Sequence, residues 1–382
     1  MLEKQDVEYL LSVGRNDILS LYLNVDPAQP ENQCIPPAYR IWLKNALEEI
    51  EGKAAEEKRR EVRDLIIRIR DYITVYRAGG KGLAVFAGTG FWREFSLPVP
   101  VENSVHFGQP DVAPLLWVLQ EYKPAGIVLV NGTQVRFLSA FLGRVTHRKE
   151  MRMELDTSDW RRKDLKPVTG HGIYTKGSNR DAFEDRVEEQ VAAFRRFIAD
   201  QMLGWVNKHG LKRLILGGDD EAVSQVIRLL PQQLDQLVAG KLTIPLSATE
   251  NEVLSRTEPV AAAHEREQEA TLVEKTLEAA RAGSQAAIGL SDVLGVLQEG
   301  RAQKVIAVWP LDGSAYQCTG CGYASAQPLS KCLICGNAVI ERLLKELLPR
   351  LAYARKAEIE LVSGAAAERL AVCDGIAALL RY

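Results

Sequence analysis

Four cysteines in the last third of the chain have the spacing of a metal site. The sequence contains Cys318-Thr-Gly-Cys321 and, after ten intervening residues, Cys332-Leu-Ile-Cys335, and a glycine follows each motif. Two residues between paired cysteines let both thiolates face one ion, and the following glycine permits a tight turn that directs backbone amides toward sulfur. Because four sulfurs leave no coordination position for water, the pattern predicts a structural Zn²⁺ ion in a zinc ribbon over residues 313–338.

Two other interpretations of these cysteines are weaker. A thioredoxin-like redox pair needs only one Cys-x-x-Cys motif, and two motifs this close together argue against it. Four unrelated buried cysteines would not each share the paired spacing and the glycine. Cys34 and Cys373 have no partner spacing, so we expect an incidental loop thiol and a core residue, respectively. Six cysteines in 382 residues do not make a disulfide framework, which favours a reduced, cytoplasmic setting.

Other side chains with chemical potential form no recognisable catalytic set. The five histidines lack a nearby serine, cysteine or aspartate at a spacing that suggests a triad. The pair Asp219-Asp220 follows a predicted strand and could bind Mg²⁺, but a helix N-cap is the favoured role. We therefore assign no catalytic residue.

Composition limits the class of protein. A chain of 382 residues is long enough for two or three domains, and its 46% hydrophobic and 26% charged residues are typical of globular proteins. The net charge of −2 requires any contact with nucleic acid to come from a local basic patch. The N-terminus lacks the pattern of a signal peptide, and no apolar run reaches the roughly 18–20 residues of a membrane span, so no membrane partner is expected.

The elements that must position these residues group into three expected domains in a mixed α/β (α+β) protein. Residues 1–108 contain a strand near 18–25, a long charged helix over 38–76 broken near Gly52, and a short buried strand at 82–88.

Residues 109–258 are expected to form a central domain. A buried strand at 125–131 ends in Asn131-Gly132, a strong hairpin turn, and strands over 135–141 and 144–155 continue the meander. An amphipathic helix through Phe183 and Trp205, a strand at 213–217, a helix near 221–230 and a strand near 234–239 follow, which indicates a mixed sheet covered by helices.

A basic loop over residues 156–179 separates the meander from the long helix. Its glycines favour an irregular path, and its cations could contact RNA phosphates while Trp160 or Tyr174 stacks on an unpaired base. A solvated loop without a partner is the plainer alternative. The candidate RNA-binding residues in and beside this loop are Arg161, Arg162, Lys163, Lys166, His171, Lys176 and Arg180.

Residues 259–382 are expected to alternate between helices and strands. Helices are predicted over 261–282, 286–299, 339–354 and 365–370, and strands over 304–309, 358–362 and 376–381. The cysteine motifs interrupt this domain as an insertion.

In the order of these features the whole chain resembles the archaeal and eukaryotic class-1 peptide-chain release factors and their relative Pelota. More narrowly, it resembles the bacterial proteins grouped with that superfamily. Gly126-Ile-Val-Leu-Val-Asn-Gly132 resembles the start of the family's central domain, and the basic loop with the helix of Arg180, Phe183 and Arg186 resembles its tip loop and following helix. Asp374-Gly-Ile-Ala-Ala-Leu-Leu-Arg-Tyr382 is similar to the family's closing strand, and archaeal members also carry a Cys-x-x-Cys minidomain.

The resemblance implies a ribonuclease-H-like central domain and a C-terminal domain like ribosomal protein L7Ae that carries the zinc ribbon. It also implies ribosome binding through ribosomal and transfer RNA, with a translational GTPase as a conceivable delivery partner.

Two departures from the family define the expected function. Release factors carry Gly-Gly-Gln at the central tip, whereas Thr169 to Asn179 contains no such motif, and the nearest string, Gly283-Ser284-Gln285, is expected at a helix end. The stop-codon motif Asn-Ile-Lys-Ser is absent between Gly52 and Val62. The resemblance therefore implies ribosome rescue, surveillance or hibernation, more as a binding factor than as an enzyme. Two alternatives stay open: a peptidyl-tRNA hydrolase or nuclease that uses His171, and a zinc-ribbon interaction scaffold.

Overall fold

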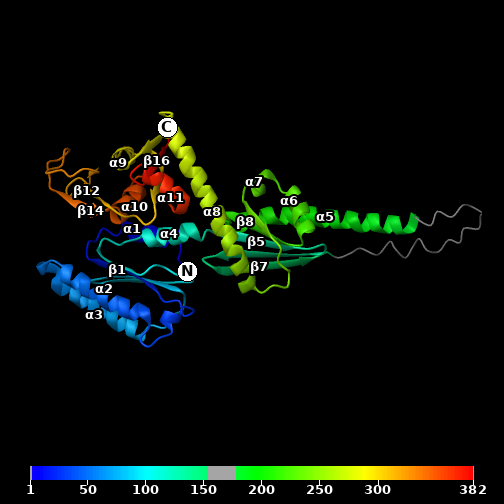
Figure 1. Ribbon diagram of the computed structural model, residues 1–382, viewed down its shortest axis with the longest axis horizontal. Coiled ribbons are helices and arrows are strands. Elements are labelled where there is room, and N and C mark those ends of the chain that lie inside the picture. The colour runs from blue at the N-terminus through cyan, green and yellow to red at the C-terminus, as the bar shows by residue number, and fades with distance from the viewer. Residues whose placement is uncertain (1, 154–177, 382) are drawn as a thin grey trace, which may run out of the picture. The chain divides into compact units, whose positions relative to one another are not determined.

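The computed structural model describes residues 2–153 and 178–381, with side chains in the opening turns of α5 described from Arg186 onward (Figure 1). The chain divides into two compact units. Unit 1 comprises Met1–Tyr122 with Glu265–Tyr382, and unit 2 comprises Lys123–His264. Four sheets with helices packed on them account for the strands of the described ranges, which confirms the prediction of a multidomain mixed α/β protein.

The N-terminal part of unit 1 is built on an antiparallel sheet of order β3-β2-β1-β4. Its strands are β1 (Ile18–Asn24), β2 (Gly82–Gly88), β3 (Phe91–Leu97) and β4 (Ser104–Gly108). Leu19, Leu21 and Leu23 alternate along β1 and face α2 (Ala38–Lys53) and α3 (Arg59–Val75). The short turn η2 (Glu56–Lys58) separates these two helices, so the predicted break near Gly52 is confirmed.

The other face of this sheet carries aromatic side chains. Tyr22 and Phe86 meet edge to face with ring centroids 5.9 Å apart. The hydroxyl of Tyr22 donates a hydrogen bond of 2.6 Å to the carbonyl oxygen of Asp111, so this buried polar group is satisfied. The helices α1 (Lys4–Ser12) and α4 (Ala113–Glu121) and the turn η1 (Pro30–Asn32) complete this part of the unit.

The C-terminal part of unit 1 has three layers. Its sheet has the order β10-β16-β11-β15, and β11 pairs parallel with β15 and antiparallel with β16. Val305 and Ala307 face the core beside α9 and α10, whereas Ile306 faces the core shared with α8 and α11. The elements are α8 (Glu250–Arg281), β10 (Ala286–Ile288), α9 (Leu290–Gln298), β11 (Ala302–Val308), α10 (Leu344–Ala354), β15 (Glu358–Val362), α11 (Gly364–Ala371) and β16 (Ile376–Leu380).

A small antiparallel sheet carries the cysteine motifs. It has the order β13-β12-β14 and consists of β12 (Ser314–Cys318), β13 (Ala324–Ser325) and β14 (Val339–Leu343). The chain enters it after β11 and leaves it directly into α10, as expected for an insertion.

Unit 2 contains one mixed sheet of order β7-β6-β5-β8-β9 within its described residues. The strands β5 (Ala125–Val130), β6 (Gln134–Phe141) and β7 (Arg144–Arg152) form the predicted meander. The strands β8 (Arg213–Gly218) and β9 (Val238–Leu242) continue it in parallel with β5. Val128 and Val130 face α5 (Ser178–His209) and α6 (Asp220–Arg228), while Ile127 and Leu129 face a second core that includes Val253 of α8.

The hairpin turn predicted at Asn131-Gly132 is confirmed, with a specific cause. The side-chain oxygen of Asn131 accepts hydrogen bonds from the backbone amides of Thr133 at 3.0 Å and Gln134 at 2.8 Å. Asparagine favours such turns because its side chain reaches the backbone two or three residues ahead.

Two expected helices begin as strands in the structure. Residues 286–299 are predicted as one helix, but β10 pairs with β16, and Gly289 at φ +82° separates it from α9. Residues 339–354 are predicted as one helix, but β14 pairs with β12. Both strands are stabilised by partners that are remote in sequence, and local periodicity cannot reveal such partners.

Two further boundaries differ from the prediction. The strand expected near 234–239 is a short helix, α7 (Gln232–Asp235), followed by β9. The helix expected from residue 261 is the later part of α8, which already begins at Glu250 and contains Pro259. A proline favours a helix boundary in sequence, yet α8 continues through it.

None of the helices in the described ranges combines the length and the apolar content needed to cross a bilayer.

A half-buried guanidinium connects segments of unit 1 that are remote in sequence. Nη1 of Arg350, in α10, donates to the carbonyl oxygens of Leu11 at 2.6 Å and Val13 at 3.1 Å. Nη2 donates to Leu10 at 3.5 Å and Pro110 at 3.3 Å. The last carbonyls of a helix lack partners within it, so Arg350 satisfies the end of α1.

Replacement of this guanidinium should destabilise unit 1. We expect Arg350→Met to cost about 2–4 kcal/mol, because several buried carbonyls would lose a charged donor. Guanidinium denaturation followed by tryptophan fluorescence measures the change. The matched control is Arg355→Met, at an exposed position just after α10, which should stay within about 0.5 kcal/mol of the parent. Equal midpoints for the two variants would contradict this role.

Candidate functional site

The structure brings the four predicted metal-binding cysteines together. The Sγ atoms of Cys318, Cys321, Cys332 and Cys335 all lie within 4.8 Å of one another. The Sγ atoms of Cys318 and Cys335 are 3.4 Å apart, and those of Cys321 and Cys332 are 3.5 Å apart. Tetrahedral Zn–S bonds of about 2.3 Å would set sulfurs roughly 3.8 Å apart. The four residues therefore fit a metal ion in a closed shell of four sulfurs.

The two motifs have the same local backbone structure. The amide of Cys318 donates to the carbonyl of Tyr323 at 2.8 Å, and the amide of Cys332 donates to that of Asn337 at 2.9 Å. The glycines after each motif, Gly322 and Gly336, have φ of +76° and +72°. Only glycine adopts this region without strain, so the predicted tight turns are confirmed.

Backbone amides point at the sulfur that opens each motif. The amides of Gly320 and Cys321 lie 3.3 and 3.5 Å from Sγ of Cys318, and the amide of Ile334 lies 3.4 Å from Sγ of Cys332. Such donors stabilise thiolates, the form in which cysteine binds metals.

The pKa values of the cysteines follow these contacts. The amide of Cys321 is the largest influence that lowers the pKa of Cys318 to about 6, and the amide of Cys335 is the largest that lowers the pKa of Cys332. The amide of Tyr323 acts in the same sense on Cys321, but burial and the adjacent thiols outweigh it and raise that pKa to about 12. Close thiolates repel one another, and a bound cation removes that repulsion.

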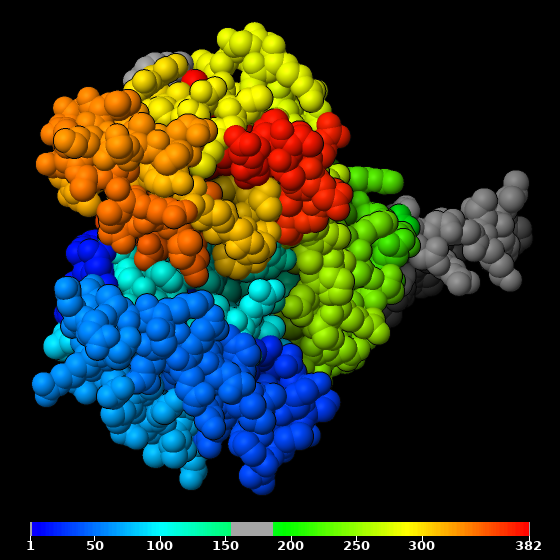
Figure 2. All heavy atoms as spheres, turned by 60° about the vertical axis from the view of Figure 1, so that its left-hand side comes forward, coloured from blue at the N-terminus to red at the C-terminus, as the bar shows by residue number. Residues whose placement is uncertain are grey.

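The cysteine cluster lies at the periphery of unit 1, at the end of the β12–β14 sheet (Figures 1 and 2). Cys318 and Cys332 are buried, whereas Cys321 and Cys335 are exposed. Cys34 is exposed, as predicted for a loop thiol, and Cys373 is half-buried against the core beside α8 and α11.

The predicted RNA-binding residues fall largely outside the described residues. Arg161, Arg162, Lys163, Lys166, His171 and Lys176, together with Trp160 and Tyr174, belong to the undescribed segment 154–177. Arg180 belongs to the first turn of α5, where side chains are not described.

The C-terminal half of α5, remote from this segment, packs against the sheet. Trp205 of α5 lies against Phe137 of β6, with ring centroids 5.9 Å apart, and against His209 at 4.3 Å. His209 in turn lies 4.2 Å from His147 of β7. Nζ of Lys149 also donates to the side chain of Gln201 at 2.8 Å. The base of α5 is thus tied to the sheet that precedes the basic loop.

Two other sequence predictions are confirmed as structural features. Asp219 is the N-cap of α6, where its carboxylate accepts a 3.1 Å hydrogen bond from the amide of Ala222. Asp220 lies 3.3 Å from Nζ of Lys241, so the pair does not converge on a metal site. Gly283, at φ +64°, follows the end of α8, which confirms the helix-end interpretation of the Gly-Ser-Gln string.

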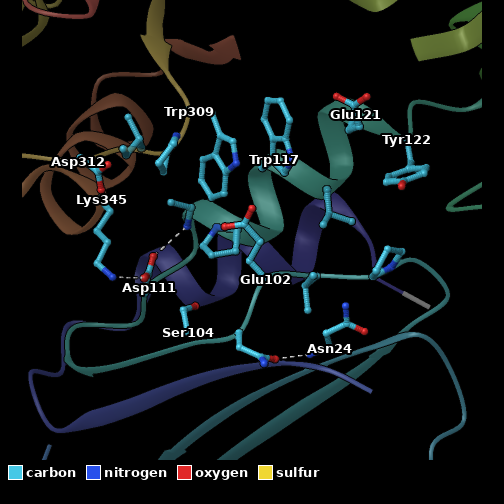
Figure 3. A pocket seen from close by; sticks show the side chains of 18 of the residues that line it. Asn24, Glu102, Ser104, Asp111, Trp117, Glu121, Tyr122, Trp309, Asp312 and Lys345 are labelled. Atoms are coloured by element: carbon cyan, nitrogen blue, oxygen red, sulfur yellow. Dashed lines mark hydrogen bonds and ion pairs between the residues drawn. The ribbon is translucent and has the colours of Figure 1, made fainter. Parts of the chain in front are cut away.

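Sequence reasoning missed a cavity in unit 1. This cavity has a volume of about 640 Å³ and lies between β1, the segment before β4, α4, the segment after β11, and α10 (Figure 3). Trp117 and Trp309 are among its lining residues, together with several acidic and amide side chains. These residues come from five separate stretches of sequence, so no local sequence motif predicts the cavity.

Comparison with known proteins gives a family match for the central residues and one curated relative. Residues 110–262 match the model of bacterial archaeo-eukaryotic release factor family 10. The chain is 21% identical over 246 residues to the uncharacterized protein YocB of Bacillus subtilis, which covers 62% of this chain and 89% of YocB.

Two solved structures are also similar. Dom34 of S. cerevisiae, a translation termination-like factor that interacts with Hbs1, has a TM-score of 0.43 and 12% identity over 86% of this chain and 77% of Dom34. Archaeal Pelota, in a ribosome-bound arrangement with ABCE1, has a TM-score of 0.42 and 13% identity over 99% of this chain and 94% of that chain.

The family match covers the central residues 110–262, which are similar to a bacterial family of archaeo-eukaryotic release factors. For these central residues, the resemblance to release factors inferred from the sequence is confirmed.

Removal of metal from the cysteine cluster should act locally. We expect chelation to increase amide hydrogen exchange over residues 313–338 and to leave unit 2 unchanged, because all four ligands lie in the insertion. Faster exchange in unit 2 would contradict this expectation.

Cobalt provides a spectroscopic test of the same cluster. Titration of the metal-free protein with Co²⁺ should produce the thiolate charge-transfer bands of a tetrahedral four-sulfur site. Cys335→Ser should weaken Co²⁺ binding roughly tenfold or more, and Cys34→Ser, the matched control at an exposed cysteine, should leave it unchanged. Equal affinities of the two variants would disprove the ligand assignment.

Proposed function

We propose that this protein is a ribosome-binding translation factor that acts in ribosome rescue, surveillance or hibernation without Gly-Gly-Gln-dependent peptide release. The observation that carries the proposal is the match of residues 110–262 to a release-factor family, combined with a sequence that contains no Gly-Gly-Gln. A factor with this central domain but without the catalytic tip motif keeps the means to bind and lacks the group that positions water.

The basic loop between β7 and α5 is the proposed RNA contact. Arg161, Arg162 and Lys163 supply a dense group of cations, in a protein whose net charge is only −2. Because the protein as a whole does not attract phosphates, a local group of this kind must supply most of the electrostatic affinity. The packing of Trp205 and His209 against the sheet supports the proposal in one respect: it fixes the C-terminal end of α5, the helix that follows the loop.

Zinc is the proposed ion of the cysteine cluster, and its proposed role is to hold the insertion folded. Four thiolates in a closed shell favour Zn²⁺ among common divalent ions and leave no open position for a substrate. The same proposal includes a cytoplasmic location and, as the resemblance to release factors implies, a translational GTPase as a delivery factor.

Sedimentation through sucrose tests ribosome binding. The full chain should co-sediment with bacterial 70S ribosomes. The triple variant Arg161→Glu, Arg162→Glu, Lys163→Glu should weaken binding roughly tenfold or more at about 100 mM salt, because it loses phosphate contacts and adds repulsion. The matched control reverses three exposed cations of unit 1, Lys44→Glu, Arg77→Glu and Lys81→Glu, and should retain binding.

The outcomes separate the proposed function from its alternatives. Absence of co-sedimentation at every salt concentration tested would contradict the proposal, and equal loss in both triple variants would remove the specific role of the loop. Release of labelled peptide from stalled complexes would favour the hydrolase, and loss of that release in His171→Ala would assign it to the loop. Recovery of only non-ribosomal partners would favour the scaffold.

A further inference from the structure

The cavity of unit 1 has an aromatic wall made by two residues that are far apart in sequence. Trp117 of α4 and Trp309, which follows β11, stack with ring centroids 5.3 Å apart and an angle of 3° between their planes. The guanidinium of Arg266 lies 5.4 Å from the ring centroid of Trp117. An indole face attracts a cation through its quadrupole, so this aromatic pair already accommodates one cationic group.

The opposite wall is polar. Figure 3 shows the two indoles on one side of the cavity and Asn24 and Ser104 on the other. Asn103 also lines the cavity, and its side-chain oxygen accepts a 2.6 Å hydrogen bond from the backbone amide of Asn24. A volume of about 640 Å³ lies within the range typical of small-molecule sites.

The charged residues that line the cavity favour a positively charged ligand. The charged side chains of the lining are four carboxylates and one ammonium group. The carboxylates are those of Glu102, Asp111, Glu121 and Asp312, and the ammonium group is that of Lys345. Lys345 is neutralised by the buried Asp111, at 2.8 Å, as Figure 3 shows. Glu121 is likewise paired, with Arg266.

Two carboxylates of the cavity are available to a ligand. Among the described residues, Glu102 and Asp312 have no side-chain hydrogen-bond or ion-pair partner, and both are exposed to solvent. A phosphate or carboxylate ligand would meet repulsion there, whereas a cation would gain charge-assisted hydrogen bonds.

From this combination we propose that the cavity binds a small organic cation that carries alkylammonium or guanidinium groups. Glu102 and Asp312 take the positive groups, and the indoles of Trp117 and Trp309 contact the alkyl chain. This chemistry is shared by free polyamines and by lysine or arginine side chains of a peptide. The cavity is lined by residues of unit 1 alone, so it would add a binding activity to the ribosome-binding function proposed for unit 2.

Isothermal calorimetry on the full-length protein tests this site with three probes. Spermidine represents free polyamines, an arginine-containing tetrapeptide with blocked ends represents protein side chains, and adenosine monophosphate is the anionic comparison. We expect saturable one-site binding of at least one cation with quenching of tryptophan fluorescence, and no binding of the nucleotide. The cation with the higher affinity identifies the source. Absence of heat with both cations, or equally tight binding of the nucleotide, would overturn the proposal.

Paired variants separate a specific site from general attraction to an acidic surface. Glu102→Gln with Asp312→Asn should weaken cation binding roughly tenfold or more, because it removes both charged acceptors. Glu57→Gln with Asp71→Asn makes the same change in net charge at exposed positions outside the cavity and should change affinity less than about twofold. Equal weakening in both pairs would overturn the site.

Circular dichroism and sedimentation with ribosomes complete this design. Both paired variants should keep the parent spectrum and the parent ribosome binding, because neither changes the loop of unit 2. Loss of cation binding with intact ribosome binding therefore tests the cavity alone, and failure of ribosome binding in the parent protein would leave the calorimetric result standing.

Discussion

Unit 1 depends on two charges of α10, the buried Glu346 and the half-buried Arg350, that bind the N-terminal part of the chain. Arg350 donates to carbonyls at the end of α1 and to Pro110, and Glu346, one turn earlier, accepts hydrogen bonds from His106 at 2.6 Å and from the amide of Gln109 at 3.1 Å. A buried charge without such partners is costly, so α10 has one favourable position against these segments. Lys345, which lies beside Glu346 in sequence, reaches Asp111 from that position. The cavity between α4, β1 and α10 exists because these contacts hold its walls in place.

The metal cluster, in contrast, depends on contacts within a single segment of the chain. Its four ligands come from 18 consecutive residues and are organised by turns and amides within the same segment. Such a site forms wherever its segment is inserted, provided that the flanking strands pair. The pairing of β12 with β14 meets that requirement, and the closed sulfur shell then stabilises an insertion with little apolar core of its own. This division assigns stability to the metal and leaves recognition to other surfaces.

In unit 2 the sheet topology requires a long connection between β5 and β8. Two strands that pair in parallel, β5 and β8, need a connection that returns to the starting edge of the sheet. Here that connection contains β6, β7, the basic segment and α5. Tilted ring contacts of Trp205 and His209 with each other, and of His209 with His147 of β7, hold the C-terminal end of α5 on the sheet.

The sequence alone determined the features that rest on local chemistry. The cysteine spacing, the turn at Asn131, the cap at Asp219 and the break near Gly52 each depend on residues a few positions apart, and all four were predictable. Only the tertiary structure decided that Ala286–Ile288 and Val339–Leu343 are strands, because their partners are distant and pairing outweighs local helix preference. The cavity had no counterpart in the sequence analysis for the same reason. Trp117 and Trp309 carry no shared pattern, and their stacking arises only when α4 packs beside the end of β11.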